Sequence, residues 1–533
     1  MTARLPFPLV DEISRHCLQD DTPETVHIEV HLPGRLDHEG LRTAFHQALA
    51  RHPRVLVRQS PTRWWHRHYT WQLAPAPDVD PVAFPPPGPD ALARARTRAL
   101  TDCPPLDAAP PVRLEVIDPP HTTDDHQPAA PTGTVLLLTL HHTALDAPAG
   151  LRILATAADL YREAIRQGPT PPPPTPTPPM ATPPTARAPQ QRARTEVRGE
   201  GGAETERAEP AGPAERAEPS APLTPSALPA LPAQSPAPSP YRPGPLTRPA
   251  RLAPDHTATT ATTHRSAPRS PRPGNGILLA ALPLPTRPHP RRSTGHSPSS
   301  PHTVNDQLLV ATHLMATHWN ALHDRPTAPV IVTMPIDDRP RGPHMPIGNG
   351  TRLTPVAFPP TPTRGSFAPN APTVTHLLHQ TAARTRALKS AAPGPQLGFP
   401  STALTSLPLP VGARRALTRV LRALAAPWTP TALLSNIGRV PYPLDFGDAG
   451  GRATAVWFSA PARMPRGVSV TAAATRDGDR IHLALRWSRA LLDDAAAAQL
   501  LALFRTSLAA TASATTSPPP VGAAPRTEGG GAP

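Results

Sequence analysis

Residues 132–161 read TGTVLLLTLHHTALDAPAGLRILATAADLY and contain the strongest strand signal in the chain. The segment from Val135 to Leu140 is almost continuously apolar, which is typical of a buried strand. From Gly150 onward, apolar residues recur with the 3.6-residue period of a helix. Between strand and helix lies His141-His142-Thr143-Ala144-Leu145-Asp146. Loops at strand ends are where folds often present reactive groups, so this segment is the candidate site.

Chance is the competing explanation for this HHxxxD spacing. The chain has 24 histidines, so adjacent pairs arise by accident, and an aspartate before a helix often only caps it. Taken alone, the spacing leaves both interpretations open. The rest of the chain has to decide between them.

Strands and helices are predicted on both sides of this segment. Thr303 and Asp306 have the spacing of an acidic capping box, and Asp477-Gly478-Asp479 is a hairpin signal. The mixture predicts an α/β protein of the layered α+β kind. Strands are predicted at 26–33, 110–117, 277–284, 329–336, 468–476 and 480–488, and helices at 41–52, 91–100, 303–323 and 493–508.

Proline content predicts the domain organisation. The chain has 84 prolines in 533 residues, and residues 168–274 hold 28 of them with few aliphatic side chains. Such a segment cannot bury enough apolar surface to offset its ordering entropy. We therefore predict a lobe over 1–167, a disordered linker over 168–274, a second lobe over 275–510 and a disordered tail over 511–533. Deleting residues 172–270 is then expected to leave a soluble, active protein.

Charge and cysteine content exclude several classes of function. The net charge is +14, but the basic residues include a single lysine, and the linker arginines alternate with glutamates, so nucleic-acid binding is not predicted. Cys17 and Cys103 are too few for a metal cage or a disulfide framework, which suits a reducing cytoplasm. We find no export signal, no apolar run of membrane-spanning length, and no GxGxxG, Walker, GxSxG or HExxH motif.

Further motifs accompany HHxxxD along nearly the whole chain outside the linker. Together they resemble the condensation-domain superfamily of chloramphenicol-acetyltransferase-like acyltransferases, which includes peptide-synthetase condensation domains, wax ester synthases and polyketide-associated acyltransferases. The matching segments are LRTAFHQALARHPRVLVR (41–58), PPLDAAPPVRLEVI (104–117), HHTALDAPAG (141–150), TVNDQLLVAT (303–312), MPIDDRPRG (334–342), IGN (347–349), LLSNIGRV (433–440) and PLDFGDAGG (443–451).

The resemblance implies two similar lobes that form a V, with a tunnel between them where donor and acceptor meet. It also implies that His142 is the catalytic base, that His141 shapes the site, and that Asp146 pairs with Arg339 across the lobes. Gly150 belongs to the same signature and is expected to support the site. The chemistry agrees, since imidazole accepts a proton near neutral pH.

Other positions of the resemblance are less decisive. Asn436 and Gly438 are expected to line the tunnel and bind substrate or to latch the backbone, while a simple turn is the alternative. Asp445 lies in a DFG segment that lacks the tryptophan of plant relatives, and we interpret it as structural. The family has glycine where this chain has Ala147, which is tolerable unless the position needs a positive φ.

The resemblance implies a stand-alone acyltransferase in secondary-metabolite or lipid biosynthesis. It would move an acyl group from coenzyme A or a phosphopantetheinyl carrier protein to a small hydroxyl or amine acceptor, as a cytoplasmic monomer with no bound metal or cofactor. The alternative is a catalytically inactive condensation-like module that recruits partners in a biosynthetic assembly. Ala147 and the long linker motivate that alternative.

Overall fold

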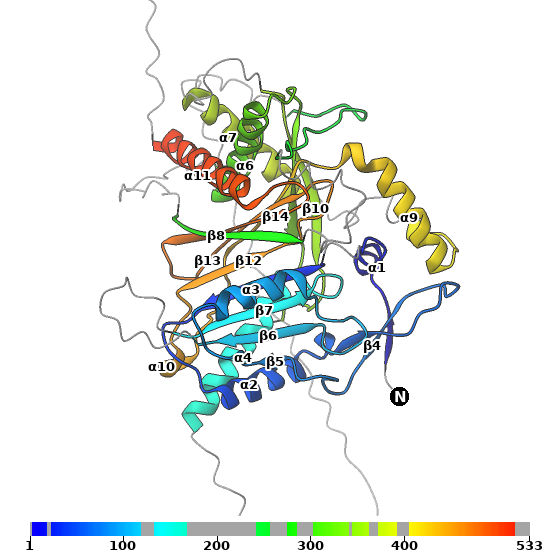
Figure 1. Cartoon of the computed structure of the whole chain (residues 1–533), viewed down its shortest axis with the longest axis vertical. Coiled ribbons are helices and arrows are strands. Elements are labelled where there is room, and N and C mark those ends of the chain that lie inside the picture. The colour runs from blue at the N-terminus through cyan, green and yellow to red at the C-terminus, as the bar shows by residue number, and fades with distance from the viewer. Residues whose placement is uncertain are drawn as a thin grey trace, which may run out of the picture. The chain divides into compact units, whose positions relative to one another are not determined.

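The computed structural model describes residues 3–18, 23–118, 133–167, 241–255, 274–284, 302–340, 344–361, 371–391 and 404–516. These residues belong to one compact unit, which comprises Met1–Pro169 and Pro238–Pro533. Their strands form sheets of three, five and six strands, with helices packed on them (Figure 1). The mixed, layered class predicted from the sequence is confirmed.

The five-stranded sheet has the order β12-β2-β7-β6-β5 and carries the HHxxxD segment at the end of β7. Alternate side chains of its strands enter two different cores. One face packs against α2 and α4, and the other packs against the alanines of α3. The elements are β2 (Thr25–His31), α2 (His38–Arg51), β5 (Val82–Ala83), α3 (Ala91–Thr101), β6 (Val112–Ile117), β7 (Val135–His141), α4 (Ala147–Gln167) and β12 (Ala455–Ser459).

Gly150 lets α4 lie close to this sheet. A Cβ atom at this position would come within 2.6 Å of the Ile28 side chain and 2.7 Å of the Leu140 side chain. Real Cβ atoms do not approach other atoms so closely, so a larger residue would push α4 away from β2 and β7. Gly150 therefore allows the first turns of α4 to pack closely against β2 and β7.

The six-stranded sheet has the order β10-β9-β11-β13-β14-β8, and α6, α7 and α11 contribute to the core beside it. Thr303 and Asp306 form the predicted capping box at the start of α6, and β13 and β14 form the predicted hairpin. The elements are β8 (Asn275–Pro283), α6 (Val304–Leu322), β9 (Val330–Asp337), β10 (Thr351–Phe358), α7 (Ala371–Ser390), β11 (Ala432–Arg439), β13 (Val468–Ala474), β14 (Arg480–Ser488) and α11 (Asp494–Thr516).

The three-stranded sheet is small and has the order β1-β4-β3. Trp71 of β4 stacks on Phe7 at 4.0 Å between ring centroids, and its indole N–H donates to Asp11 at 2.8 Å. The remaining elements are β1 (Arg4–Pro6), α1 (Leu9–His16), β3 (Val57–Gln59), β4 (Thr70–Leu73), α9 (Val411–Ala425), α10 (Gly447–Gly450) and the short 3-10 turns Pro53–Val55 and Ala426–Trp428.

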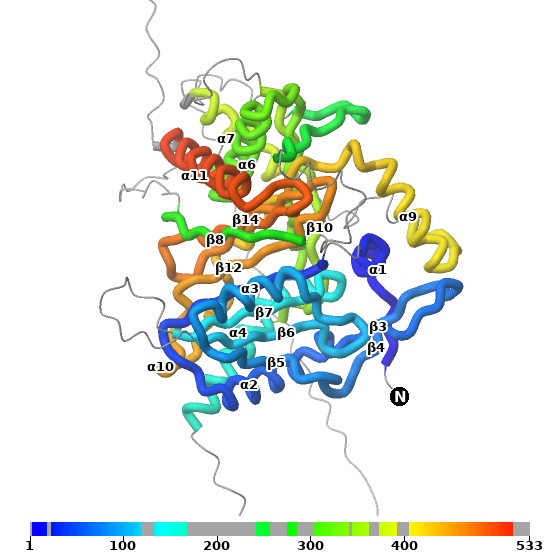
Figure 2. The backbone as a smooth tube through the Cα atoms, in the orientation of Figure 1, coloured from blue at the N-terminus to red at the C-terminus, as the bar shows by residue number. Residues whose placement is uncertain are grey.

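Strand β12 connects the two halves of the chain. It follows β11 in sequence, yet it pairs antiparallel with β2, and Val456 lies opposite Val30. In Figure 2 the orange trace of β12 lies next to the blue and cyan elements of the first half of the chain. The region predicted as the second lobe, residues 275–510, therefore contributes a strand to the sheet of the first. Hydrogen bonds between strands depend on tertiary placement, so apolar periodicity could not assign β12 to a sheet.

Residues 241–255 pack on the second core, although they lie inside the predicted linker. Leu252 and Ala253 are buried there. Trp319 donates from its indole N–H to the Ala253 carbonyl at 2.9 Å, and the Asn320 amide bonds both Ala253 N–H and the Arg251 carbonyl at 2.9 Å.

The prediction of an unpacked linker over 168–274 is therefore wrong for residues 241–255. Polar side chains of α6 form hydrogen bonds with the backbone of this segment. Average composition over a long window cannot reveal a short segment that packs in this way. The remaining linker residues, 168–240 and 256–273, lie outside the described part of the chain. So do residues 517–533 of the predicted tail, whereas residues 511–516 continue α11.

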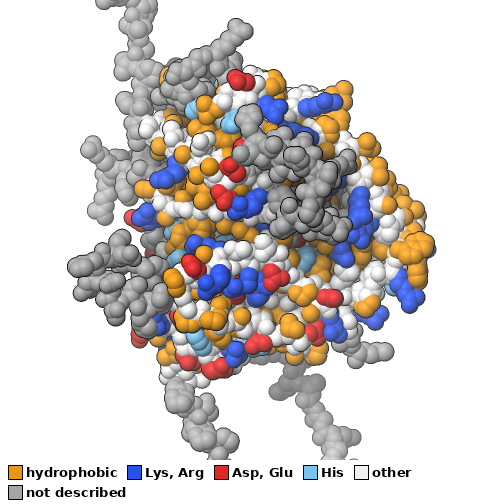
Figure 3. Space-filling model, viewed as in Figure 1, with side chains coloured by type: hydrophobic (Ala, Val, Ile, Leu, Met, Phe, Trp, Pro, Cys, Tyr) orange, Lys and Arg blue, Asp and Glu red, His pale blue; other side chains and the backbone are white. Residues whose placement is uncertain are grey.

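Charges of both signs are mixed on the surface, and one long apolar helix contributes to the second core. Figure 3 shows basic and acidic side chains intermingled on the face in view. Within the described residues, one helix segment, Asp494–Ala514, has the length and composition of a membrane span. Leu500, Phe504 and Leu508 of this segment belong to the second core.

Candidate active site

The HHxxxD segment leaves β7 as a tight turn. The His142 N–H donates to the Glu24 carbonyl at 2.7 Å, which extends the pairing of β7 with the chain before β2. Ala144 N–H then bonds back to the His141 carbonyl at 2.9 Å. Asp146 caps α4, because its Oδ1 accepts the Ala149 N–H at 3.1 Å. The strand, turn and cap together hold both histidine side chains in place.

The His142 ring is oriented by the backbone of its own loop. Its Nδ1 lies 3.4 Å from the Leu145 carbonyl oxygen. A carbonyl only accepts hydrogen bonds, so this contact favours the Nδ1–H tautomer and leaves the Nε2 lone pair available. Burial, together with the positive charge of Arg463, lowers the pKa of His142 to about 4. The ring is therefore neutral at pH 7.

His142 lines a small cavity of about 150 Å³. Most of its walls are apolar, and strands of both large sheets contribute to them. Besides His142, the polar residues that line it, among the described residues, are Asp146, Thr351, Ser435, Arg463 and Arg466. Its apolar lining comprises Val26, Ala147, Pro148, Pro335, Leu353, Leu433, Phe458, Ala460 and Pro461.

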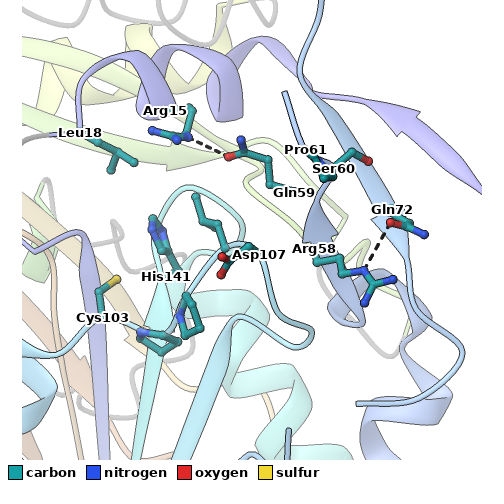
Figure 4. Close-up of a pocket in the computed structure, with 13 residues that line it drawn as sticks. Arg15, Leu18, Arg58, Gln59, Ser60, Pro61, Gln72, Cys103, Asp107 and His141 are labelled. Carbon is teal, nitrogen blue, oxygen red and sulfur yellow. Dashed lines mark hydrogen bonds between the residues drawn. The ribbon is translucent and has the colours of Figure 1, made fainter. Parts of the chain in front are cut away.

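His141 faces a different and larger cavity of about 720 Å³, together with Arg15, Arg58 and Cys103 (Figure 4). The His141 Nδ1 accepts the Thr143 N–H at 3.1 Å, and burial lowers the pKa of this imidazole to about 3. The two adjacent histidines thus line separate cavities. The two imidazoles therefore have different surroundings, and the division of roles between them stays a prediction.

Cys103 also lines the larger cavity, and sequence reasoning did not place it near the histidines. Burial raises the pKa of the Cys103 thiol to about 12. The nucleophilic form of cysteine is the thiolate, which this environment suppresses. The cysteine therefore does not provide an activated nucleophile at neutral pH.

The ion pair that the resemblance implies is present. Arg339 Nη2 lies 2.7 Å from Asp146 Oδ2, and both side chains are almost fully buried. Arg339 also donates to Asp337, and the Gly350 N–H donates to Asp146 Oδ2 at 3.1 Å. A Cβ on Gly350 would lie 2.1 Å from Arg339 Nε, so glycine makes room for the guanidinium. Burial raises the pKa of Asp146, and the Arg339 charge opposes that rise.

Asn349 ties the HHxxxD turn to the segment after β9, a role that sequence reasoning missed. Its Nδ2 lies 3.1 Å from the His142 carbonyl and 2.9 Å from the Thr143 carbonyl. It also lies 3.0 Å from Asp11 Oδ1. Burial raises the pKa of Asp11 to about 6. Asn349 lies in the IGN segment (347–349) of the resemblance, and this motif was the sequence feature that could have identified it as a site residue.

Asn436 and Gly438 hold an irregularity in β11. Asn436 Oδ1 accepts the Gly438 N–H at 2.9 Å, and Gly438 has a φ of +74° at a shift in strand register. The lining of the two cavities includes the neighbouring Ser435 but neither of these residues. The local geometry thus corresponds to the backbone-latching alternative. Asp445 likewise accepts the Gly447 N–H at 3.0 Å and pairs with Arg452.

A group of arginines surrounds Glu24 at the edge of the small cavity. Arg463 forms an ion pair with Glu24, and both Arg422 and Arg486 lie close enough to lower the pKa of that carboxyl, although burial raises it overall. No motif marks these arginines, because they come from irregular or distant segments. Within the described residues, no group of three or more His, Cys, Asp or Glu side chains has a metal-binding arrangement.

Solved structures of condensation domains are similar to this chain. A variant of the starter condensation domain of rhizomide synthetase RzmA, in complex with C8-CoA and Leu-SNAC, is 13% identical with a TM-score of 0.53, over 96% of this chain and 95% of that chain. The first condensation domain of the CDA synthetase is 12% identical with a TM-score of 0.52, over 97% of both chains.

A third similar structure is the condensation domain from the Monacolin K polyketide synthase MokA. It is 11% identical with a TM-score of 0.50, over 96% of this chain and 97% of that chain. No protein-family model matches the sequence, and no curated protein matches it. The likeness therefore concerns the fold: this chain has the two-lobed condensation-domain fold that its motifs resemble.

Proposed function

We propose that the protein transfers an acyl group from a thioester to a hydroxyl or amine, with His142 as the general base. The observation that carries this proposal is the state of the His142 ring. It is neutral at pH 7, it is oriented through Nδ1, and it faces a mostly apolar cavity with its Nε2 lone pair available. A base needs this protonation state and this geometry.

The reaction would proceed without a covalent enzyme intermediate. His142 Nε2 takes the proton from the acceptor O–H or N–H while the acceptor atom bonds to the thioester carbonyl carbon. The resulting tetrahedral intermediate collapses, the carbon–sulfur bond breaks, and the thiolate takes the proton from His142. The proton that leaves the acceptor ends on the released thiol, and no oxidant is needed. The suppressed thiolate of Cys103 supports direct transfer.

Coenzyme A or carrier-protein thioesters are the proposed donors. The RzmA structure with C8-CoA and Leu-SNAC holds an acyl thioester and an aminoacyl thioester mimic in the same fold. A chain of this fold with an oriented imidazole is suited to the same class of substrate. We propose that it acts in the cytoplasm and that separate carrier proteins serve as partners where coenzyme A does not.

Two observations favoured the alternative of an inactive recruiting module, namely Ala147 and the long linker, and the first no longer supports it. Ala147 is the first residue of α4, and Asp324 is the only non-glycine residue with a positive φ in the part of the chain that the structure describes. Alanine thus replaces the family's glycine there without backbone strain. The substitution gives no reason to expect an inactive site.

The test is thioester consumption with a panel of acyl-coenzyme A donors and of amine and alcohol acceptors, followed by thiol release and mass spectrometry of the products. His142→Gln should lower kcat by about 10²- to 10⁴-fold, the usual contribution of a general base. His46→Gln, on the exposed side of α2 beside Asp80, is the matched control and should retain activity.

Two outcomes would contradict the proposal. If His142→Gln kept the wild-type rate, the base assignment would be wrong. If the wild-type protein consumed no donor with any acceptor, with coenzyme A or carrier protein, while still binding partners in a pull-down, the recruiting module would be favoured.

A further inference from the structure

The cavity beside His142 contains a cation without a counterion. Arg463 and Arg466 both line this cavity, whose other walls are mostly apolar. Arg463 is paired with Glu24. Arg466 has no hydrogen bond or ion pair to any residue that the structure describes, and its Nε is buried without a partner. The residue is half-buried and lines the cavity.

The neighbouring arginines have acceptors, so Arg466 differs from them. Arg486 donates to Asn275 Oδ1 at 2.7 Å and to the Thr25 carbonyl at 2.7 Å. Arg422 donates to the carbonyls of Cys17 and Met464. Glu24 is the carboxylate within this group of arginines, and it is already paired with Arg463. The region therefore holds more positive charge than its own carboxylate can neutralise.

The charge on Arg466 persists despite its surroundings. Burial, together with repulsion from Arg463 and Arg422, lowers the pKa of Arg466 to about 10. The guanidinium is thus still protonated at pH 7. An uncompensated buried cation is unfavourable, and proteins pair such groups or keep them for a ligand. The other acid at this cavity, Asp146, is engaged by Arg339.

We infer that Arg466 binds a carboxylate of the substrate beside His142. The inference rests on the proposed acyl transfer and narrows its substrate class. The carboxylate belongs either to the acceptor, as in an amino or hydroxy acid, or to the acyl group, as in a dicarboxylic acid monothioester. In both cases a planar guanidinium suits a carboxylate, because it can donate two parallel hydrogen bonds.

A phosphate of the donor does not fit this place. In coenzyme A and in carrier proteins, the whole pantetheine arm separates the thioester from the nearest phosphate. When the thioester carbonyl lies next to His142, that phosphate lies far outside a cavity of about 150 Å³. A carboxylate a few bonds from the reacting atoms can reach Arg466, and the apolar walls suit the carbon skeleton that carries it.

The experiment compares matched substrates that differ in one charge. For the acceptor, an amino or hydroxy acid is compared with its carboxamide. For the donor, succinyl-coenzyme A is compared with butyryl-coenzyme A. The wild-type protein should prefer the acid form in one of the two pairs by about 10- to 100-fold in kcat/KM, as expected for a charge-assisted hydrogen bond. The pair that shows the preference identifies which substrate carries the carboxylate.

Arg466→Gln should remove that preference, chiefly by lowering kcat/KM for the acid form, while Arg466→Lys should retain part of it. Arg476→Gln, which replaces an exposed arginine, is the matched control and should keep the preference. Because Arg466 is unpaired, Arg466→Gln should melt at the wild-type temperature or above it. A decrease in melting temperature would show that Arg466 supports the fold instead.

Two kinetic outcomes would overturn the inference. An unchanged acid preference in Arg466→Gln would exclude Arg466 from substrate recognition. An equal loss of kcat for the charged and neutral forms would assign Arg466 to the oxyanion of the tetrahedral intermediate. Calorimetric binding of the preferred acid to His142→Gln, with and without Arg466→Gln, separates the two proposals. Arg466-dependent binding supports this inference even if the base assignment fails.

Discussion

Removing Asp146 or Arg339 should destabilise the protein unequally, although the two form one ion pair. Asp146 accepts from Arg339 Nη2 at 2.7 Å, from Gly350 N–H at 3.1 Å and from Ala149 N–H at 3.1 Å. Arg339 has additional acceptors, namely both oxygens of Asp337 and two backbone carbonyls. Without Asp146, Arg339 still has Asp337 and the two carbonyls as partners. Asp146, by contrast, has no second cation among the described residues.

The magnitudes follow from these contacts. In Asp146→Ala, the bond to a charged group contributes about 1.5–3 kcal/mol, the helix cap about 1 kcal/mol and the Gly350 bond about 1 kcal/mol, so the free energy of unfolding should fall by about 3.5–5 kcal/mol. Asp146→Asn keeps an acceptor for the cap and should lose about 2–3 kcal/mol. Arg339→Met leaves Asp146 buried and uncompensated next to Asp337, and should lose about 5 kcal/mol, the upper end of the cost of breaking a buried ion pair.

Urea unfolding followed by circular dichroism would measure these differences, with the double variant Asp146→Asn/Arg339→Met as a control for coupling. The double variant should be less destabilised than the sum of its parts. Without Arg339, the folded-state pKa of Asp146 rises further above its unfolded value. The folded protein then binds more protons than the unfolded one, so Arg339→Met should gain stability as the pH falls from 8 to 5. If Arg339→Met were no less stable than Asp146→Asn, or gained nothing at pH 5, this account of the pair would be refuted.

Three further predictions concern packing and the base. Gly150→Ala should lower the free energy of unfolding by about 1–3 kcal/mol, because the added Cβ forces α4 away from the sheet. Gly88→Ala should change it little, because a Cβ there would lie 3.7 Å from Arg94 Nη2, an ordinary contact distance. Equal effects of the two substitutions in chemical denaturation would exclude the packing explanation. Leu252→Ala should lower the free energy of unfolding by about 2–4 kcal/mol, because the Leu252 side chain is buried. The control Leu246→Ala, at a side chain that is 81% exposed, should lower it by less than about 0.5 kcal/mol. If Leu252→Ala had no effect on stability, residues 241–255 would not stabilise the fold. In a pH profile, kcat/KM should fall on the acid side with a midpoint near pH 4, because His142 must be neutral to accept a proton and burial lowers its pKa to about 4. A midpoint at pH 6.5 or above would contradict the buried state of the ring.

Most secondary structure could be predicted from the sequence because its signals are local. The apolar run of β7, the period of α4 and the capping box of α6 each depend on residues within a few positions of one another. The same holds for the Asp477-Gly478-Asp479 hairpin. The pairing of β12 with β2, by contrast, joins segments more than 400 residues apart, and nothing in either segment specifies the other.

The docked segment 241–255 shows where composition fails. Its prolines resemble those of the surrounding linker, but two apolar side chains and a few backbone groups meet matching partners on α6. Averages over about a hundred residues do not detect that match. A contact of this kind is stabilising only because α6 is already in place to receive it.

At the candidate site, local patterns were enough to predict the HHxxxD segment and its position between a buried strand and a helix, and the motif resemblance predicted the partner Arg339. Three features depend on the folded chain: His141 and His142 line separate cavities, Asn349 holds the turn, and Arg466 lines the cavity of His142 without a counterion. The reason is physical. Backbone conformation follows from neighbours in sequence, whereas burial, pKa and charge balance follow from neighbours in space, which only the folded chain brings together.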